Sequence, residues 1–227
     1  MMNFWHLVHK VYDAEYLANA TRVKASIVEK VLADIGFRPT TVFFAAYNPV
    51  AELLTDQFEV YLPSEQMHYT TNDDIMIAPD GMKFDCVIAL DEFLTYQSDE
   101  AAQKAALEKL ADVCNGWLIT TLMDYKNLAP YKKNQVEVLH DYKSDAILLE
   151  QNSADLSDKQ RWSSYFYAIT EHKTLDTYGP VSRRTMYFKQ LAKYASDLGS
   201  TNYIVQKNTL YRGFGRKHWE HIITIRF

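Results

Sequence analysis

Apolar residues follow a helical spacing and then an unbroken run in the first part of the chain. The helical stripe within residues 24–36 consists of Ile27, Val28, Val31, Leu32 and Ile35. Gly36 suits the end of a helix, because glycine readily takes the left-handed backbone common there. Residues 41–46 are too few for a helix, and their β-branched and aromatic composition is typical of a strand buried on both faces. The pattern predicts a helix followed by a central strand.

Short apolar runs continue to alternate with helical stripes up to about residue 122. Further strands are predicted at 58–62, 74–78, 84–90 and 117–122. A short helix is predicted at 51–54. A longer one is predicted to begin at Ser98-Asp99-Glu100, which offers a cap and an acidic first turn, and to end at Gly116. Strands that alternate with helices in this way imply a parallel sheet with right-handed crossovers.

The pattern changes after the fifth predicted strand. Strand candidates at 146–150 and 163–170 flank a polar stretch. Residues 146–172 are therefore expected to form an inserted hairpin or lid.

The chain closes with one more helix and two strands. The helix is predicted at 184–198, with Leu191, Ala195 and Leu198 facing inward. The strands at 203–211 and 219–227 suit an antiparallel pair at the edge of a parallel sheet. Because no linker separates two cores, residues 1–227 are expected to form one domain.

Composition narrows the class of protein further. The chain has 227 residues, is 48% hydrophobic and carries a net charge of -5, which excludes a disordered chain. It has no uncharged apolar window of membrane-spanning length, and its first residues do not resemble a secretion signal. Cys86 and Cys114 lie in apolar surroundings and are expected to be buried thiols. Together these features indicate a cytoplasmic protein.

Positive charge is concentrated in one part of this acidic chain. Residues 1–119 carry 8 Lys and Arg against 18 Asp and Glu, whereas residues 120–227 carry 16 against 11. A surface for nucleic acid or another phosphate-bearing partner is one interpretation, and a solvated helix face with strand ends is the other. The residues predicted for such a surface are Arg183, Arg184, Lys189, Lys193, Arg212 and Arg216.

Polar side chains that could bind a substrate or take part in catalysis follow two of the predicted strands. Asp91 and Glu92 follow the strand at 84–90, where carboxylates could orient a substrate amine or a ribose, or else cap the next helix. The run Asp124-Tyr125-Lys126-Asn127 follows the strand at 117–122 and could line the same cleft or form a plain loop. No serine-hydrolase, P-loop or zinc motif occurs, and the pairs His6/His9 and His218/His221 have no companion ligands, so no metal site is predicted.

The order of these segments resembles the class I S-adenosylmethionine-dependent methyltransferases. The similarity covers about residues 24–227, and its best local match is the segment DGMKFDCVIALDE at 80–92, followed later by WLITTLMDYKN. The resemblance implies a Rossmann-like α/β fold: a seven-stranded, mostly parallel sheet with helices on both faces and an antiparallel terminal strand. It also implies S-adenosylmethionine bound beyond the carboxyl ends of the first strands.

The first motif of that family departs from its usual form in this sequence. The family has an acid and then spaced glycines after its first strand, whereas Phe44 stands at the acid position here and no glycine follows. A donor site implied by the resemblance would be bounded by Ala45, Ala46, Tyr47 and Asn48, by Ile77 and Ala78, and by Leu90 and Asp91, with Asp91 and Glu92 as catalytic candidates. Tyr47 would place side-chain bulk near the donor's amino-acid moiety.

Two functions are consistent with these features. The first is a methyltransferase with an atypical donor pocket and an unidentified acceptor. The second is a catalytically inactive methyltransferase fold that serves as a binding or scaffold protein through its basic C-terminal face. The missing glycines favour the second function, and the intact segment at 84–92 favours the first.

Overall fold

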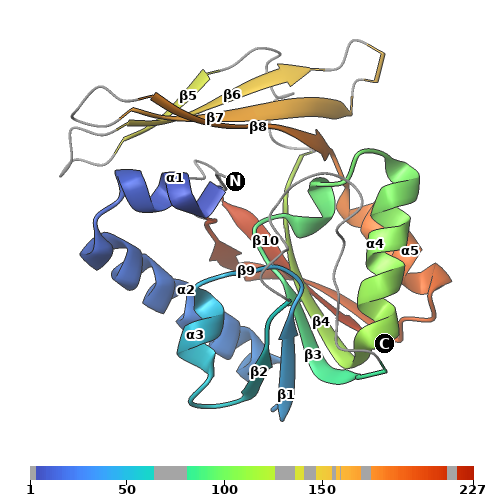
Figure 1. Cartoon of the computed structure of the whole chain (residues 1–227). Helices are drawn as coiled ribbons and strands as arrows, with labels where there is room; N and C mark the ends of the chain where they lie inside the picture. Colours follow the sequence, from blue (N-terminus) through green and yellow to red (C-terminus); the bar gives the residue numbers. More distant parts are fainter. Residues whose placement is uncertain are drawn as a thin grey trace.

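The protein contains a six-stranded sheet with a second, four-stranded sheet lying across one end of it (Figure 1). This computed structural model describes residues 4–63, 81–125, 136–140, 147–154, 157–158, 160–169, 175–213 and 219–227. The larger sheet has the strand order β2 (Glu59–Tyr61), β1 (Thr41–Phe44), β3 (Phe84–Ala89), β4 (Cys114–Met123), β10 (Glu220–Arg226), β9 (Asn202–Tyr211).

The central strands pair as the sequence predicts. β1, β3 and β4 are parallel neighbours, with Phe43 opposite Val87 and Ile88 opposite Ile119. β10 is antiparallel to both β4 and β9, and Ile223 lies opposite Thr120. The described residues form six strands of this sheet and not the expected seven; the segment 74–78, predicted as a further strand, lies outside the described residues.

Helices cover both faces of the larger sheet and create two hydrophobic cores (Figure 1). On one face, α2 (Ala14–Asp34) and α3 (Val50–Leu54) pack against apolar side chains such as Phe44 and Ile88. On the other face, α4 (Glu100–Val113) and α5 (Phe188–Asp197) cover side chains such as Phe43 and Val87. The alternation of inward side chains along β1 and β3 therefore supplies both cores.

Three expectations about helix ends are wrong. Asp99 caps α4 by accepting a 2.8 Å hydrogen bond from the Ala102 amide, as predicted, but the helix ends at Val113 and Gly116 lies inside β4. A Cβ at Gly116 would lie 2.3 Å from the Asp85 carbonyl oxygen, so this glycine serves close strand contact and not helix termination. The last helix, α5, begins at Phe188 and not at residue 184, which belongs to a strand. Leu198 lies just past the end of α5 and is 36% exposed, so it does not face inward.

The predicted hairpin belongs to a larger structure. β6 (Ile147–Ala154) and β7 (Arg161–Ile169) pair antiparallel within the expected range. β5 (Val136–His140) pairs with the outer side of β6, and β8 (Leu175–Arg184) pairs with the outer side of β7. The result is a four-stranded sheet in the order β5-β6-β7-β8. A helix that the sequence pattern did not predict, α1 (Phe4–Val11), packs against this sheet through Leu7 and Val8, which are fully buried.

Cys86 and Cys114 are buried free thiols, as expected. Burial raises the pKa of Cys114 to about 11, so this thiol stays protonated at neutral pH. No helix within the described residues is long and apolar enough to cross a membrane.

Candidate functional site

The carboxyl ends of β1 and β3 meet at the point where the strand order reverses. After β1 the chain forms β2 on one side of β1. It then crosses to the other side of β1, where it forms β3 and afterwards β4. In open α/β sheets, the loops that leave such a point in opposite directions border the usual ligand position. The predicted residues Ala45–Asn48 and Leu90–Glu92 both occupy this edge.

A buried hydrogen bond joins the two loops across the reversal. Asn48 Nδ2 donates to Asp91 Oδ2 at 2.8 Å, and both side chains are buried. Asn48 Oδ1 accepts a 3.1 Å hydrogen bond from the Val50 amide, which is the first residue of α3. One asparagine thus fixes the start of α3 and ties it to the turn after β3.

Backbone conformation explains how the first loop forms without glycine. Among the described residues, the non-glycine positions with positive φ are Asp91, at 57°, and Glu92, at 59°. Residues 45–49 therefore need no left-handed backbone, and alanine and asparagine are sterically acceptable there. The unusual backbone lies after β3 instead, and two consecutive left-handed non-glycine residues are typical of a constrained functional turn.

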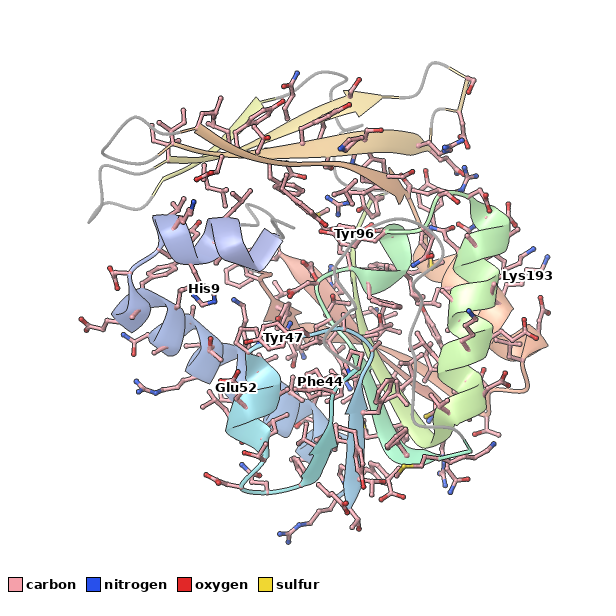
Figure 2. All side chains as sticks on the ribbon, viewed as in Figure 1. His9, Phe44, Tyr47, Glu52, Tyr96 and Lys193 are labelled. Atoms are coloured by element: carbon pink, nitrogen blue, oxygen red, sulfur yellow. The ribbon has the colours of Figure 1, made fainter. Side chains whose placement is uncertain are left out.

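The other residues of the predicted donor site do not take part in the hydrogen bond between the two loops. Ala45 and Leu90 are buried in the two cores, so their side chains are not available to a ligand at this edge. Tyr47 is half-buried and its hydroxyl donates to Glu52 Oε1 at 3.1 Å. Tyr47 and Tyr96 both pack against the cluster between α1 and the four-stranded sheet (Figure 2). Ile77 and Ala78 lie outside the described residues.

Glu92 points toward the four-stranded sheet and is fully buried. Its Oε2 accepts a 2.8 Å hydrogen bond from Arg183 Nη2, and Arg183 Nη1 reaches Glu150 Oε1 at 3.2 Å. Arg183 belongs to β8 and Glu150 to β6, so this ion-pair network joins the two sheets. A buried guanidinium between two carboxylates is strongly held, because separating them would leave charge uncompensated.

Aromatic rings enclose the same guanidinium. The Arg183 Cζ lies 4.6 Å from the Tyr96 ring centroid and 5.2 Å from that of Trp162. Tyr125, which follows β4, donates its hydroxyl to Glu92 Oε1 and packs 6.0 Å from the Trp162 ring. Each Glu92 oxygen therefore accepts from a different donor, and the carboxylate is held in a fixed orientation.

A second buried polar cluster lies on the α2 side of this edge. Lys24, Asn48, Asp91, Tyr211 and Glu220 are all buried, although they come from five separate segments of the chain. Lys24 Nζ lies 6.0 Å from the Tyr211 ring centroid. Desolvation lowers the pKa of Lys24 to about 8, against the opposing effect of the Asp91 and Glu220 charges. Burial, and then the same two carboxylates, raises the pKa of Tyr211 well above its usual value.

Sequence reasoning missed Lys24 and the role of Arg183. The buried residues of α2 recur at helical spacing as Leu17, Thr21, Lys24, Ala25, Val28, Val31 and Leu32. A lysine on that apolar stripe is the signal that could have identified Lys24. Arg183 carries no comparable signal, because its partners lie 33 and 91 positions away.

Two residues of the predicted basic surface, Arg183 and Arg184, are buried. Arg183 is 0% exposed, and Arg184 is buried in an ion pair with Asp158, so the expectation that these side chains face a partner is wrong. Both are needed to compensate buried or half-buried carboxylates. Lys189, Lys193 and Arg212 are exposed, with Lys193 pointing outward from α5 (Figure 2). Arg216 lies outside the described residues.

No protein-family model matches the sequence, and no curated protein does. Solved structures, in contrast, are similar over most of the chain. A S-adenosylmethionine-dependent methyltransferase from Clostridium acetobutylicum matches with a TM-score of 0.66 at 12% identity, covering 91% of this chain and 92% of that one. The CcbJ methyltransferase from Streptomyces caelestis matches with a TM-score of 0.64 at 16% identity, covering 91% and 94%.

A third similar structure was determined with S-adenosylmethionine bound. It is CalS10, an amino pentose methyltransferase from Micromonospora echinaspora, with a TM-score of 0.59 at 11% identity, covering 95% of this chain and 98% of that one. Because coverage is high in both directions, the similarity extends beyond the larger sheet. At these identities the likeness shows a Rossmann-like methyltransferase fold with a mostly parallel sheet.

Proposed function

We propose that this protein is an S-adenosylmethionine-dependent methyltransferase that binds its donor between the loops after β1 and β3. The observation that carries the proposal is the left-handed Asp91-Glu92 turn at the strand-order reversal, tied to the opposite loop by Asn48. The fold shared with methyltransferases, one of them with the donor bound, supports the same assignment.

The residues fit a donor that is recognised through backbone groups. Bound S-adenosylmethionine would supply an electrophilic methyl group on a cationic sulfur. The backbone of Ala45–Asn48 and Asp91 would hold the donor, because Asn48 and Asp91 fix those two loops relative to each other. Methyl transfer requires chiefly in-line positioning and exclusion of water. The four-stranded sheet, linked to Glu92 through Arg183, would cover this edge of the larger sheet for that purpose.

We assign the acceptor-facing role to Tyr125. Both Glu92 oxygens already accept hydrogen bonds, one from Arg183 and the other from Tyr125. An acceptor amine or hydroxyl would therefore meet the Tyr125 oxygen, which can take the acceptor's proton while its own proton passes to Glu92. Glu92 then acts through Tyr125, and Arg183 holds the Glu92 carboxylate in place for that step.

One observation favours the alternative of an inactive fold. Asp91 and Glu92 are buried and engaged by other side chains of the protein, and Phe44 occupies the position of the family's acid. In that case the edge between β1 and β3 would be closed, and the exposed Lys189, Lys193 and Arg212 would serve a binding surface for nucleic acid or another phosphate-bearing partner.

Calorimetric titration distinguishes the two functions. The methyltransferase proposal predicts saturable binding of S-adenosylmethionine and S-adenosylhomocysteine at one site, weakened by Asp91→Ala. Lys189→Met, on the far helix α5, is the matched control and leaves the donor affinity unchanged. Absence of binding by the folded protein, together with a salt-sensitive gel shift of oligonucleotides, would favour the inactive alternative.

A further inference from the structure

Lys24 is a lysine buried inside the protein, which is an unusual position for a cationic side chain. It lies on the buried stripe of α2 and is 6% exposed, whereas lysine side chains usually extend into solvent. Burying an ammonium group is costly unless opposite charge compensates it. The charged and titratable groups around it are Asp91 in the turn after β3, Glu220 at the start of β10, and Tyr211 and Arg212 at the end of β9.

The effect of Lys24 reaches the loop after β1 through a single intermediate residue. The Asp91 charge opposes the lowering of the Lys24 pKa, and Asp91 Oδ2 accepts the 2.8 Å hydrogen bond from Asn48 Nδ2. Asn48 Oδ1 in turn accepts a 3.1 Å hydrogen bond from the Val50 amide and so fixes the start of α3. The Tyr211 ring centroid lies 6.0 Å from Lys24 Nζ, so the ring belongs to the same cluster.

We propose that Lys24 is a positioning residue for the donor site, acting through Asp91 and Asn48 on the loop at 45–48. This inference rests on the proposed methyltransferase function. Lys24 contacts neither donor nor acceptor: its ammonium group keeps the Asp91 carboxylate in place, and Asp91 keeps the loop in the shape that the donor requires. Loss of the Lys24 proton removes the positive charge opposite Asp91 and loosens the loop.

The titration of Lys24 gives this role a measurable signature. Its pKa of about 8 places the loss of charge between pH 7 and 9. Tyr211 stays protonated over that range, because burial raises its pKa well above the usual value. A lysine with a purely structural role would not couple donor affinity to pH in this window.

The test compares S-adenosylhomocysteine binding by calorimetry at pH 7 and pH 9 in four proteins: the parent, Lys24→Met, Lys24→Arg and Lys30→Met. Lys30 is an exposed lysine on the same helix and is the matched control. At pH 7, Lys24→Met is expected to bind roughly tenfold more weakly than the parent, and at pH 9 the two converge. Lys24→Arg keeps its charge and retains affinity at pH 9. Lys30→Met follows the parent at both pH values.

Equal affinities of the parent and Lys24→Met at pH 7 would overturn the proposal. Hydrogen exchange at pH 7 separates this failure from failure of the proposed function. If the parent binds no S-adenosylhomocysteine, the methyltransferase proposal fails, and the exchange of the amides of residues 45–48 and 50 in unliganded Lys24→Met then decides the role of Lys24. Faster exchange there than in Lys30→Met supports coupling of Lys24 to the loop, and unchanged exchange contradicts it.

Discussion

Asn48 and Asp91 are 43 positions apart, yet their side chains form a buried 2.8 Å hydrogen bond across the strand-order reversal. Together with the hydrogen bond from the Val50 amide to Asn48, this bond gives the loop after β1 a defined shape by side-chain chemistry. Because Asp91 and Glu92 both adopt left-handed backbone, the turn that receives the bond is itself constrained. The two loops of the proposed donor site are therefore one coupled unit.

Replacing both residues of this pair should reveal that coupling. Asn48→Ala and Asp91→Ala are each expected to lower the free energy of unfolding by about 1–3 kcal/mol, because each leaves a buried polar partner unsatisfied. The double variant should lose about 1–2 kcal/mol less than the sum of the single losses. Urea denaturation of the four proteins measures this, and strictly additive losses would contradict the coupling.

Arg183 is expected to be among the most sensitive positions of the protein. Arg183→Met leaves Glu92 and Glu150 buried without their shared cation and should cost about 3–5 kcal/mol of unfolding free energy. Replacing both carboxylates as well, by Glu92→Gln and Glu150→Gln, should recover part of the loss.

Arg184→Met is the matched control for that experiment. Arg184 is the next residue of β8, but its partner Asp158 is 31% exposed, so solvent compensates the lost ion pair. We expect a loss of about 1 kcal/mol. If denaturation experiments gave equal losses of unfolding free energy for Arg183→Met and Arg184→Met, the buried ion-pair network would not stabilise the protein more than a partly exposed ion pair does.

Lys24 should make stability depend on pH in a defined direction. In the folded protein its pKa falls from 10.5 to about 8, so between these values the unfolded chain binds more protons. Stability of the parent relative to Lys24→Met should therefore rise from pH 8 to pH 10.5, by at most about 3 kcal/mol. Loss of the proton relieves the cost of burial, although it removes the charge opposite Asp91. Denaturation of both proteins across this range provides the test, and parallel pH profiles would exclude the shift.

Tyr125→Phe should separate donor binding from methyl transfer. The substitution keeps the ring that packs against Trp162 and removes the hydroxyl that donates to Glu92. Donor affinity is expected to stay within about twofold of the parent, whereas transfer of a tritiated methyl group to an amine or alcohol should slow roughly a hundredfold. Undiminished transfer by this variant would remove Tyr125 from the acceptor-facing role.

The central sheet was predictable because its strands carry local signals. The unbroken apolar runs around Phe43, Val87 and Ile119 indicate strands buried on both faces, and these strands are adjacent and parallel. The strands at 146–172 were also visible, but their extension by β5 and β8 depends on pairing between distant segments.

The site was only partly predictable, for a related reason. Asp91 and Glu92 could be located because they follow an apolar strand, which places them at its carboxyl end. Their partners could not, because a basic residue such as Arg183 has the same local appearance whether it is paired or solvated. Its burial results from the packing of β8 against the Glu92 turn, a contact between residues 91 positions apart.

We expect the methyl donor to bind at the edge of the sheet between β1 and β3. A crystal structure of the protein with S-adenosylhomocysteine tests it most directly. The ligand should lie at the carboxyl ends of β1 and β3, with hydrogen bonds to the backbone of Ala45–Asn48 and to the Asp91 turn. The Asn48–Asp91 hydrogen bond should stay intact. A ligand bound elsewhere, or an edge left vacant at saturating concentration, would contradict it.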